Sequence, residues 1–295
     1  MSTRVCFRRC WGALALVQLL ACSRTQVSTS TSRANLEVDV ISVGQGDAIL
    51  VSSPIGKHLL IDGGEAEAGP AVLAVLRQRN ACPLDMILLT HRHADHLGGL
   101  KRVVEECGAR LFMDGGYQHD SAIYARLLDT LEKHHVPLYQ AESGRQIELG
   151  GGAVLTLLGP PQPFIEKATD SVNANSVVSR LEMGKTSMLF AGDAEAQAEN
   201  RLLASHVTLR STVLKVGHHG SRTSSTKAFL QTVSPRLAIV SNADGDPKHP
   251  HPETLERLKG VQVLQTAREG TIHLVLDGEG VRFRTEAHPQ LERAP

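Results

Sequence analysis

The most informative feature of the sequence is a cluster of side chains that can bind a metal ion. His91, His93, Asp95 and His96 lie within the segment Thr90-His91-Arg92-His93-Ala94-Asp95-His96-Leu97-Gly98-Gly99. An apolar run precedes this segment, so the cluster begins in a loop, where no regular structure forces alternate side chains apart. Imidazole and carboxylate groups together suit a borderline divalent cation. The segment therefore predicts a metal site; the alternative is a solvated histidine-rich loop.

Three other short segments place polar side chains directly after apolar runs. They are Leu60-Ile61-Asp62-Gly63-Gly64, Leu189-Phe190-Ala191-Gly192-Asp193 and Leu214-Lys215-Val216-Gly217-His218-His219-Gly220-Ser221. A lone aspartate in such a position is a weak signal, because aspartate is common in turns. A histidine pair is also found at surfaces and in cores. Each segment indicates a metal site only when it is taken together with the histidine cluster.

Alternating strands and helices must position these segments. Short apolar runs separated by glycine and proline predict an antiparallel meander over 36–43, 48–52 and 57–61. Beyond it, the pattern predicts helices over 70–78, 96–107, 121–134, 195–204, 226–232 and 252–258, and strands over 86–89, 111–113, 150–158, 176–182, 187–191, 213–216 and 237–240, followed by three short strands. Two sets of strands with flanking helices predict two sheets packed face to face in one α/β domain over residues 36–295.

The composition excludes several classes of protein. The chain has 295 residues, of which 41% are hydrophobic, so it can bury a sizeable core and is neither disordered nor fibrous. Basic and acidic residues both number 31, and only 3% of residues are aromatic. These values argue against a strongly basic nucleic-acid clamp or a surface of stacking aromatic rings. The 14 histidines again point to metal binding or proton transfer.

The first 35 residues have the pattern of an export signal followed by a tether. Three arginines precede an apolar run from Trp11 to Ala21, which is shorter than the ~20 residues of a membrane-spanning helix and typical of a signal peptide. The stretch Leu19-Leu20-Ala21-Cys22 resembles a bacterial lipobox. Residues 1–21 are therefore predicted to be a lipoprotein signal with Cys22 lipidated, and residues 22–35 a Ser/Thr-rich tether. An ordinary secretory signal or a short uncleaved anchor is the alternative.

Each of these interpretations predicts that the domain lies outside the cytoplasm, as a membrane-anchored lipoprotein or a secreted or periplasmic protein. Removal of residues 1–21 would leave a net charge of 28 − 31 = −3. Two cysteines, Cys82 and Cys107, remain in the predicted domain. In an oxidising compartment they could pair, or they could be two buried free thiols, and the sequence leaves both possibilities open.

The histidine cluster also carries a family resemblance. The pattern H-x-H-x-D-H after a strand, read from His91 to His96, resembles the metal-binding signature of the metallo-β-lactamase superfamily. Members of this superfamily have a four-layer αββα sandwich with a one- or two-metal site at one edge of the sheets. The resemblance implies that Asp62 orients a ligating histidine and that Asp193 bridges two metal ions. It also favours His219 as a ligand and places His218 toward substrate, with the reverse assignment open.

A departure from the superfamily pattern narrows the resemblance. Many members supply a third histidine between the H-x-H pair and the bridging aspartate, but this chain has no histidine from Val136 to Asp193. Asn173-Ala174-Asn175-Ser176 stands in the expected place. Together with Val43-Gly44-Gln45-Gly46-Asp47-Ala48 and Lys248-His249-Pro250-His251-Pro252, this feature resembles the metallo-hydrolase domain of ComEC-like competence proteins. Such domains are implicated as nucleases or phosphodiesterases.

The resemblance implies a role for each residue of the site. Two divalent ions, zinc (Zn²⁺) or manganese (Mn²⁺), would be held by His91, His93 and Asp193, with Asn175 or water nearby, and by Asp95, His96, Asp193 and His219. The ions would make a bridging water acidic, and Asp95 would orient the resulting hydroxide for attack. The transition state would be stabilised by further side chains, namely His218, Ser221, His249 and His251. For His249 and His251 the alternative is a surface loop that proline makes rigid, and Asp47 either reaches the metal edge or fixes its turn.

The sequence thus predicts an extracytoplasmic, metal-dependent phosphodiesterase or nuclease that uses a metal-bridged hydroxide. Single-stranded DNA or a small phosphodiester would be the substrate, and a DNA-uptake channel is a candidate partner. The charge of −3 is unusual for a protein that binds long nucleic acids. One alternative is a hydrolase of lactams, lactones or thioesters on the same fold. Another is a lipid-anchored module that binds DNA or metal without hydrolysing it.

Overall fold

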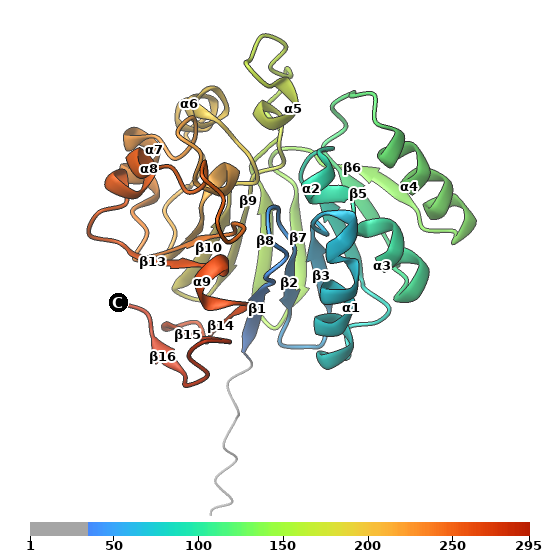
Figure 1. Ribbon diagram of the computed structural model, residues 1–295, viewed down its shortest axis with the longest axis horizontal. Coiled ribbons are helices and arrows are strands. Elements are labelled where there is room, and N and C mark those ends of the chain that lie inside the picture. The colour runs from blue at the N-terminus through green and yellow to red at the C-terminus, as the bar shows by residue number, and fades with distance from the viewer. Residues whose placement is uncertain (1–34) are drawn as a thin grey trace, which may run out of the picture. The chain divides into compact units, whose positions relative to one another are not determined.

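Two β-sheets packed face to face form the centre of the protein. The computed structural model describes residues 35–295. Its nine-stranded sheet has the order β16-β15-β14-β1-β2-β3-β4-β5-β6, and its seven-stranded sheet has the order β13-β12-β11-β10-β9-β8-β7. Helices cover the outer face of each sheet (Figure 1). The predicted α/β sandwich with four layers, αββα, is confirmed.

The strands are short. The nine-stranded sheet contains β1 (Leu36–Val40), β2 (Ile49–Ser52), β3 (His58–Ile61), β4 (Met86–Leu89), β5 (Phe112–Asp114), β6 (Leu138–Gln140), β14 (Ile272–Leu276), β15 (Val281–Thr285) and β16 (Glu292–Arg293). The seven-stranded sheet contains β7 (Gln146–Gly150), β8 (Ala153–Leu157), β9 (Ser179–Met183), β10 (Thr186–Phe190), β11 (Val213–Lys215), β12 (Leu237–Val240) and β13 (Gln262–Gln265).

The helices lie between these strands in the sequence. They are α1 (Gly69–Gln78), α2 (Ala94–Leu97), α3 (Leu100–Glu106), α4 (Ala122–Lys133), α5 (Ser171–Ala174), α6 (Ala196–Ala204), α7 (Lys227–Val233), α8 (Pro252–Arg257) and α9 (Thr266–Glu269), with two 3₁₀ turns, η1 (Ala66–Ala68) and η2 (Gly217–Gly220). No helix among residues 35–295 combines the length and apolar character that a membrane span requires.

Alternation along the strands explains why the sheets are covered on both faces. Successive side chains of a strand point to opposite faces, so a strand buried on both sides is apolar throughout. In β3, Leu59 and Ile61 pack in the core between the two sheets, whereas Leu60 packs under the helices. In β10, Met188 and Phe190 belong to the core between the sheets, and Leu189 packs under α6 and α7.

The parallel strands place the candidate site residues at one edge of the two sheets. Strands β3 to β6 pair in parallel in the first sheet, and β10 to β13 pair in parallel in the second. The carboxyl ends of parallel strands meet at the same edge of a sheet, and ligands bind there in α/β proteins. Asp62, His91, Asp193 and His218 all follow such ends. Asp62, His91 and Asp193 follow β3, β4 and β10, respectively, and His218 lies in η2, the turn after β11.

The structure corrects several predicted boundaries. The helix predicted over 96–107 is two helices, α2 and α3, which are separated at Gly98 and Gly99. Glycine is a poor helix former, and residue 99 must be glycine because a side chain there would strike the carbonyl oxygen of Gly63. The strand predicted over 150–158 is the shorter β8, and β6, most of β7 and α5 fall in segments where no element was predicted. The predicted signal peptide, Cys22 and nearly all of the tether lie outside the described residues, and β1 begins at Leu36.

Cys82 and Cys107 form a disulfide, which decides between the two possibilities that the sequence leaves open. The bond joins residues 25 positions apart in the chain, between the loop before β4 and the C-terminal end of α3. Closing a loop of this size restricts the unfolded chain, so we expect the double variant Cys82→Ser/Cys107→Ser to lose about 3.5 kcal/mol of unfolding free energy. Guanidinium denaturation of the variant and of the oxidised wild type measures this difference. A loss below about 1 kcal/mol would contradict the expectation.

Candidate metal centre

Asp62 holds the imidazole of His96 in place. Asp62 follows β3 with a left-handed φ of 57° and is fully buried. Its carboxylate accepts hydrogen bonds from the backbone N–H and the hydroxyl of Thr90, both at 2.7 Å, and lies 2.8 Å from Nδ1 of His96. These contacts orient His96 so that its other ring nitrogen, Nε2, faces the carboxylates of Asp95 and Asp193. A carboxylate on the second ring nitrogen is the usual way in which a protein orients a metal-ligating histidine.

Four ligand atoms converge beside His96. One atom each from Asp95, His96, Asp193 and His219 lies within 4.8 Å of the others. The His96 Nε2 atom is 3.4 Å from Oδ1 of Asp193. The Nε2 atom of His219 is 3.3 Å from Oδ2 of Asp95 and 3.6 Å from Oδ2 of Asp193. The structure therefore brings together four residues that are distant in sequence and that the resemblance assigns to one metal ion.

His91 also faces Asp193, and His93 lies next to His91. The Nε2 atom of His91 is 3.8 Å from Oδ2 of Asp193, and the rings of His91 and His96 have centroids 4.1 Å apart. The ring of His93 is 4.9 Å from that of His91, and its Nε2 atom lies 3.5 Å from Oδ2 of Asp170. Asp193 therefore has a carboxylate oxygen near each of the two groups of histidines. This arrangement suits a bridging role.

The protonation of these groups suits a cation. Burial, together with the nearby His96, holds the pKa of His91 well below its usual value, so its imidazole is neutral and can donate a lone pair. Burial would raise the pKa of Asp193, but His96 and His219 hold it well below its usual range, so this carboxylate is ionised. Burial would also lower the pKa of His96, but the carboxylates of Asp193 and Asp62 raise it well above its usual value. Without a metal ion a proton therefore balances these carboxylates, and a metal ion that binds to Nε2 must displace the proton from that atom.

Unpartnered buried atoms test whether a metal ion fits here. Among the described residues, the Nε2 atoms of His91, His96 and His219 and the Oδ1 atom of Asp193 are buried without a hydrogen-bond partner of good geometry. Buried polar atoms are almost always paired, so four such atoms facing one another need a common partner. Imidazole nitrogens and carboxylate oxygens are ligands of divalent metals. The donor set therefore fits a divalent metal ion, and both zinc and manganese suit it.

The turn after β11 separates the roles of His218 and His219. Both residues have left-handed backbone angles, with φ of 47° and 53°, so their side chains point in different directions. The Nδ1 atom of His219 lies 3.1 Å from the carbonyl oxygen of Ser241, which aims its Nε2 atom at Asp95 and Asp193. His219 is buried, whereas the His218 side chain is 23% exposed. This geometry favours His219 as the ligand.

His218 instead lies at the rim of the centre. Its Nδ1 atom is 3.3 Å from the Glu195 carboxylate, and its Nε2 atom is 3.8 Å from Oδ2 of Asp193. Burial lowers the pKa of His218, but the carboxylates of Glu195 and Asp193 outweigh this effect and raise it. The His249 ring stacks on the His218 ring, with centroids 5.7 Å apart, and Nδ1 of His249 lies 3.0 Å from Asp246. The structure thus brings His249 to the rim as well.

Asn173 occupies the position that Asn175 was expected to fill. Asn175 is buried, and its amide contacts only backbone: it accepts from the Ile165 N–H and donates to the carbonyls of Ile165 and Ser171. Asn175 therefore fixes the loop before α5. The neighbouring Asn173 has an unpartnered buried Oδ1 atom, and its Nδ2 atom lies 3.5 Å from Nε2 of His218. The short helix α5 decides between the two amides, and the sequence analysis did not predict this helix.

Ser221 and His251 have structural partners. The Ser221 hydroxyl bonds to the Thr223 hydroxyl at 2.9 Å within the same loop. The Nδ1 atom of His251 accepts from the Glu253 N–H and so caps the N-terminus of α8. Their contacts give no support to the interpretation of these two residues as substrate-binding, because both side chains are used to hold the loops around the centre.

Asp47 reaches the metal edge as half of a buried ion pair. Its Oδ1 atom lies 2.9 Å from Nζ of Lys215, and both side chains are almost completely buried. The same oxygen is 3.9 Å from Nδ1 of His219. Gly46, with φ of 111°, lets the turn pack directly against the backbone carbonyl of Asp95, where a side chain would clash. The glycine therefore serves a close approach of two protein backbones.

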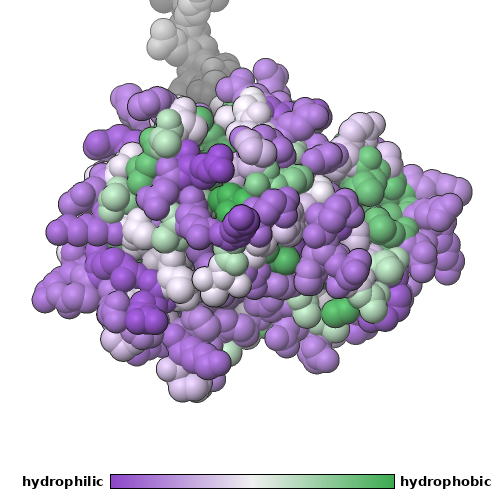
Figure 2. All heavy atoms as spheres, turned by 90° about the horizontal axis from the view of Figure 1, so that it is seen from above, coloured by the Kyte–Doolittle hydropathy of each residue, from purple (hydrophilic) through white to green (hydrophobic). Residues whose placement is uncertain are grey.

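Sequence reasoning missed four residues around the centre: Asp170, Asn173, Glu195 and Lys215. Only Lys215 carried a clear signal. It lies in an otherwise apolar strand, and lysine is almost never fully buried unless it is paired. Asp170 lies in a loop whose course the sequence does not define, and Glu195 lies at the start of a predicted helix, where an acidic residue is common and carries no signal of its own. Figure 2 looks onto this edge of the sheets and shows a mainly hydrophilic surface.

The Asp62 contacts lead to a test of this arrangement. We expect Asp62→Asn to weaken divalent metal binding about 10- to 100-fold, because the amide holds the His96 ring less firmly and no longer increases its basicity. Competition with a chromogenic chelator measures the affinity. Asp129→Asn, at an exposed position of α4, is the matched control. Equal affinities of the two variants would contradict the assigned role of Asp62.

An αββα sandwich with histidines and aspartates gathered at the carboxyl ends of its strands defines a class of metal-dependent hydrolases. A family model described as the metallo-beta-lactamase superfamily matches residues 41–243. The chain belongs to this superfamily, as the sequence motif predicted.

The chain is also similar to proteins named for competence and recombination. It is 30% identical over 265 residues to Recombination protein 2 of Haemophilus influenzae, an alignment that covers 87% of this chain and 31% of that protein. It is 28% identical over 257 residues to ComE operon protein 3 of Bacillus subtilis, covering 80% of this chain and 32% of that protein. It is 30% identical to Competence protein ComA of Neisseria gonorrhoeae, with coverage of 83% and 33%. The chain thus spans about a third of the length of these relatives.

Solved structures support the fold. The metallo-beta-lactamase fold protein YhfI from Bacillus subtilis aligns with a TM-score of 0.52 at 14% identity, covering 79% of this chain and 96% of that chain. The E377D mutant of the CmlA beta-hydroxylase aligns with a TM-score of 0.54 at 12% identity, covering 82% and 54%. The predicted resemblance to the superfamily and to ComEC-like competence proteins is confirmed.

Proposed function

We propose that this protein is an extracytoplasmic, metal-dependent phosphodiesterase or nuclease of the ComEC-like kind. The observation that carries the proposal is that the Asp193 carboxylate faces the buried imidazoles of His91, His96 and His219, with asparagine where many members of the superfamily have a third histidine. The similarity to competence proteins supports a substrate of the nucleic-acid type. The disulfide supports an oxidising compartment, because such bonds are rare in the cytosol.

The residues of the centre form two sets of ligands, one for each metal ion. His91, His93 and Asp193 would hold one ion, and Asp95, His96, His219 and Asp193 would hold the other. When bound, two divalent ions supply Lewis acidity for the phosphoryl oxygens and make water acidic enough to react at neutral pH. Zinc and manganese both suit these ligands. Asp95, whose carboxylate is partly exposed, is placed to orient the attacking water.

Residues at the rim would bind the substrate. The His218 side chain is 23% exposed. The Glu195 carboxylate lies 3.3 Å from the Nδ1 atom of His218 and so fixes the orientation of the ring. A proton on Nε2 would donate to a phosphoryl oxygen as negative charge develops there. Asn173 and His249, which contact the His218 ring, would form the substrate-binding rim together with His218. The predicted lipid anchor at Cys22 and a DNA-uptake channel partner belong to the same proposal.

A substrate panel tests the reaction class. Purified protein loaded with manganese or zinc is expected to hydrolyse bis-p-nitrophenyl phosphate and single-stranded DNA, and His93→Ala is expected to abolish both activities. The panel also contains nitrocefin and an acyl thioester. Faster turnover of nitrocefin or the thioester than of any phosphodiester would contradict the proposal. Binding of DNA by the wild type and the variant alike, without hydrolysis, would point to a binding module instead.

A further inference from the structure

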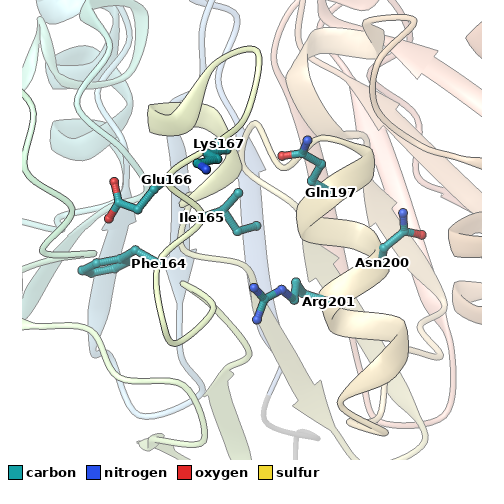
Figure 3. A pocket seen from close by; sticks show the side chains of 7 residues that line it. All are labelled: Phe164, Ile165, Glu166, Lys167, Gln197, Asn200 and Arg201. Carbon is teal, nitrogen blue, oxygen red and sulfur yellow. The ribbon is translucent and has the colours of Figure 1, made fainter.

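Two cavities lie on the outer, helix-bearing side of the seven-stranded sheet. The first, of about 550 Å³, lies between the loop before α5 and helix α6. Figure 3 shows Gln197 and Arg201 reaching from α6 toward the loop that carries Ile165 and Lys167. The second cavity, of about 610 Å³, lies where β10, β11 and β12 begin. Four cationic residues line it, namely Arg180, Lys185, Arg210 and Arg236.

The first cavity opens beside the metal centre. Its loop wall is fixed by Asn175, which bonds to both the N–H and the carbonyl of Ile165, and it continues to Asp170, which lies 3.5 Å from His93. Its helical wall begins directly after Glu195, which contacts His218. A ligand that extends from the centre between α5 and α6 would therefore enter this cavity.

Arg180 of β9 lines the second cavity and shows that both cavities lie on the same face of the sheet. It pairs with Leu189 of β10, and Leu189 shares a core cluster under the helices with Ile165, which lines the first cavity. The Arg180 Nε atom donates to the Arg210 carbonyl oxygen at 2.9 Å and to the Ser211 hydroxyl at 3.2 Å, and both residues line the second cavity. Both cavities therefore lie on one surface, the outer face of the sheet. We call the six cations on this surface, Lys167, Arg201, Arg180, Arg210, Lys185 and Arg236, the basic track.

Positive charge on the basic track is largely uncompensated. In the part of the chain that the structure describes, Lys167, Arg201, Arg210 and Arg236 have no acidic group within ion-pair distance. Only Arg180 and Lys185 are paired, with Glu182 and Glu279. The acid of the first cavity, Glu166, points away from α6 in Figure 3, and its carboxylate accepts from the Tyr117 hydroxyl at 3.3 Å. A chain with no net charge therefore concentrates free cations on one surface.

We propose that the basic track binds the phosphate backbone of a polynucleotide strand whose scissile phosphate lies at the metal centre. The inference rests on the proposed function and adds the path of the strand. The second cavity lies at the opposite ends of β10 and β11 from the centre, and the five residues of β10 span about 17 Å. A small phosphodiester cannot bridge that distance. Arginine and lysine contacts of this kind recognise phosphates without reading sequence.

Equilibrium binding tests the track apart from catalysis. The probe is a fluorescein-labelled single-stranded DNA of about 12 nucleotides, measured by anisotropy with the full chain in EDTA. Each lost phosphate contact removes about 0.7 from the slope of log K against log salt, so Arg210→Ala/Arg236→Ala should make the slope shallower by about 1.4 and weaken binding about 25-fold at about 0.1 M salt. The matched control is Arg126→Ala/Lys133→Ala, two exposed cations of α4.

The outcomes separate the track from the proposed function. Since the Arg210 and Arg236 side chains are exposed and unpaired, the variant should fold, and its metal-loaded form should hydrolyse bis-p-nitrophenyl phosphate at the wild-type rate. Lys167→Ala/Arg201→Ala should weaken DNA binding in the same way. Affinity and salt slope equal to those of the α4 control, in both track variants, would overturn the track even if the protein hydrolyses phosphodiesters. Intact, track-dependent DNA binding without any phosphodiester turnover would overturn only the proposed function.

Discussion

Asp193→Asn is expected to lower phosphodiester hydrolysis by more than about 1,000-fold and to remove at least one equivalent of bound metal. The reason is geometric. The Asp193 carboxylate is buried and faces His91, His96 and His219, so it is the acidic group that both sets of ligands share. An amide at this position keeps the shape but loses the negative charge that two adjacent cations require.

The measurement combines metal analysis with turnover of bis-p-nitrophenyl phosphate. Asp129→Asn, which removes an equal charge from the exposed surface of α4, should retain wild-type metal content and activity. If Asp193→Asn bound two ions and retained more than about a tenth of the activity, Asp193 would not bridge the site.

Lys215→Met is expected to cost about 3–5 kcal/mol of unfolding free energy. Both Lys215 and its partner Asp47 are almost completely buried, and Nζ of Lys215 also donates to the Val216 carbonyl oxygen at 3.0 Å. Removal of the lysine leaves a buried carboxylate without its counter-charge, and this desolvated charge is the source of the loss. Guanidinium denaturation of the disulfide-bonded protein measures the effect.

Two control variants make this result specific. Lys101→Met breaks the exposed pair between Lys101 and Glu105 and should change the stability by less than about 1 kcal/mol. The double variant Lys215→Met/Asp47→Asn should recover much of the loss, because no unpaired charge stays buried. A Lys215→Met variant as stable as Lys101→Met would show that the pair contributes little.

The sequence was informative about the centre because strand ends determine where side chains meet. Asp62, His91, Asp193 and His218 follow parallel strands, so their convergence follows from topology once the two sheets are recognised. The αββα layers could be predicted for the same reason, since buried parallel strands are continuously apolar and alternate with amphipathic helices.

The remainder depended on loops that local sequence does not define. The choice of Asn173 over Asn175 depends on the single turn of α5, whose N-terminus Asp170 caps by accepting from the N–H groups of Val172 and Asn173. His251 was expected near substrate, but a histidine before proline and glutamate can equally cap a helix, and it does so here. At the break between α2 and α3, Gly99 packs against Gly63, a tertiary contact that periodicity along the helix cannot show.

The local charge also revises what composition suggested. A net charge near zero argues against a strongly basic nucleic-acid clamp, yet the free cations beside α6 and before β11 and β12 lie on one surface. Composition averages over the whole molecule, whereas association with a polyanion depends on the local potential.

We propose that the protein hydrolyses a phosphodiester with two divalent ions bound at the shared edge of the sheets. The most direct measurement is a titration of the metal-free protein with manganese or zinc, during which hydrolysis of bis-p-nitrophenyl phosphate is followed. We expect activity to rise to a plateau at two equivalents of metal per chain. A plateau at one equivalent, or no hydrolysis at any metal loading, would contradict it.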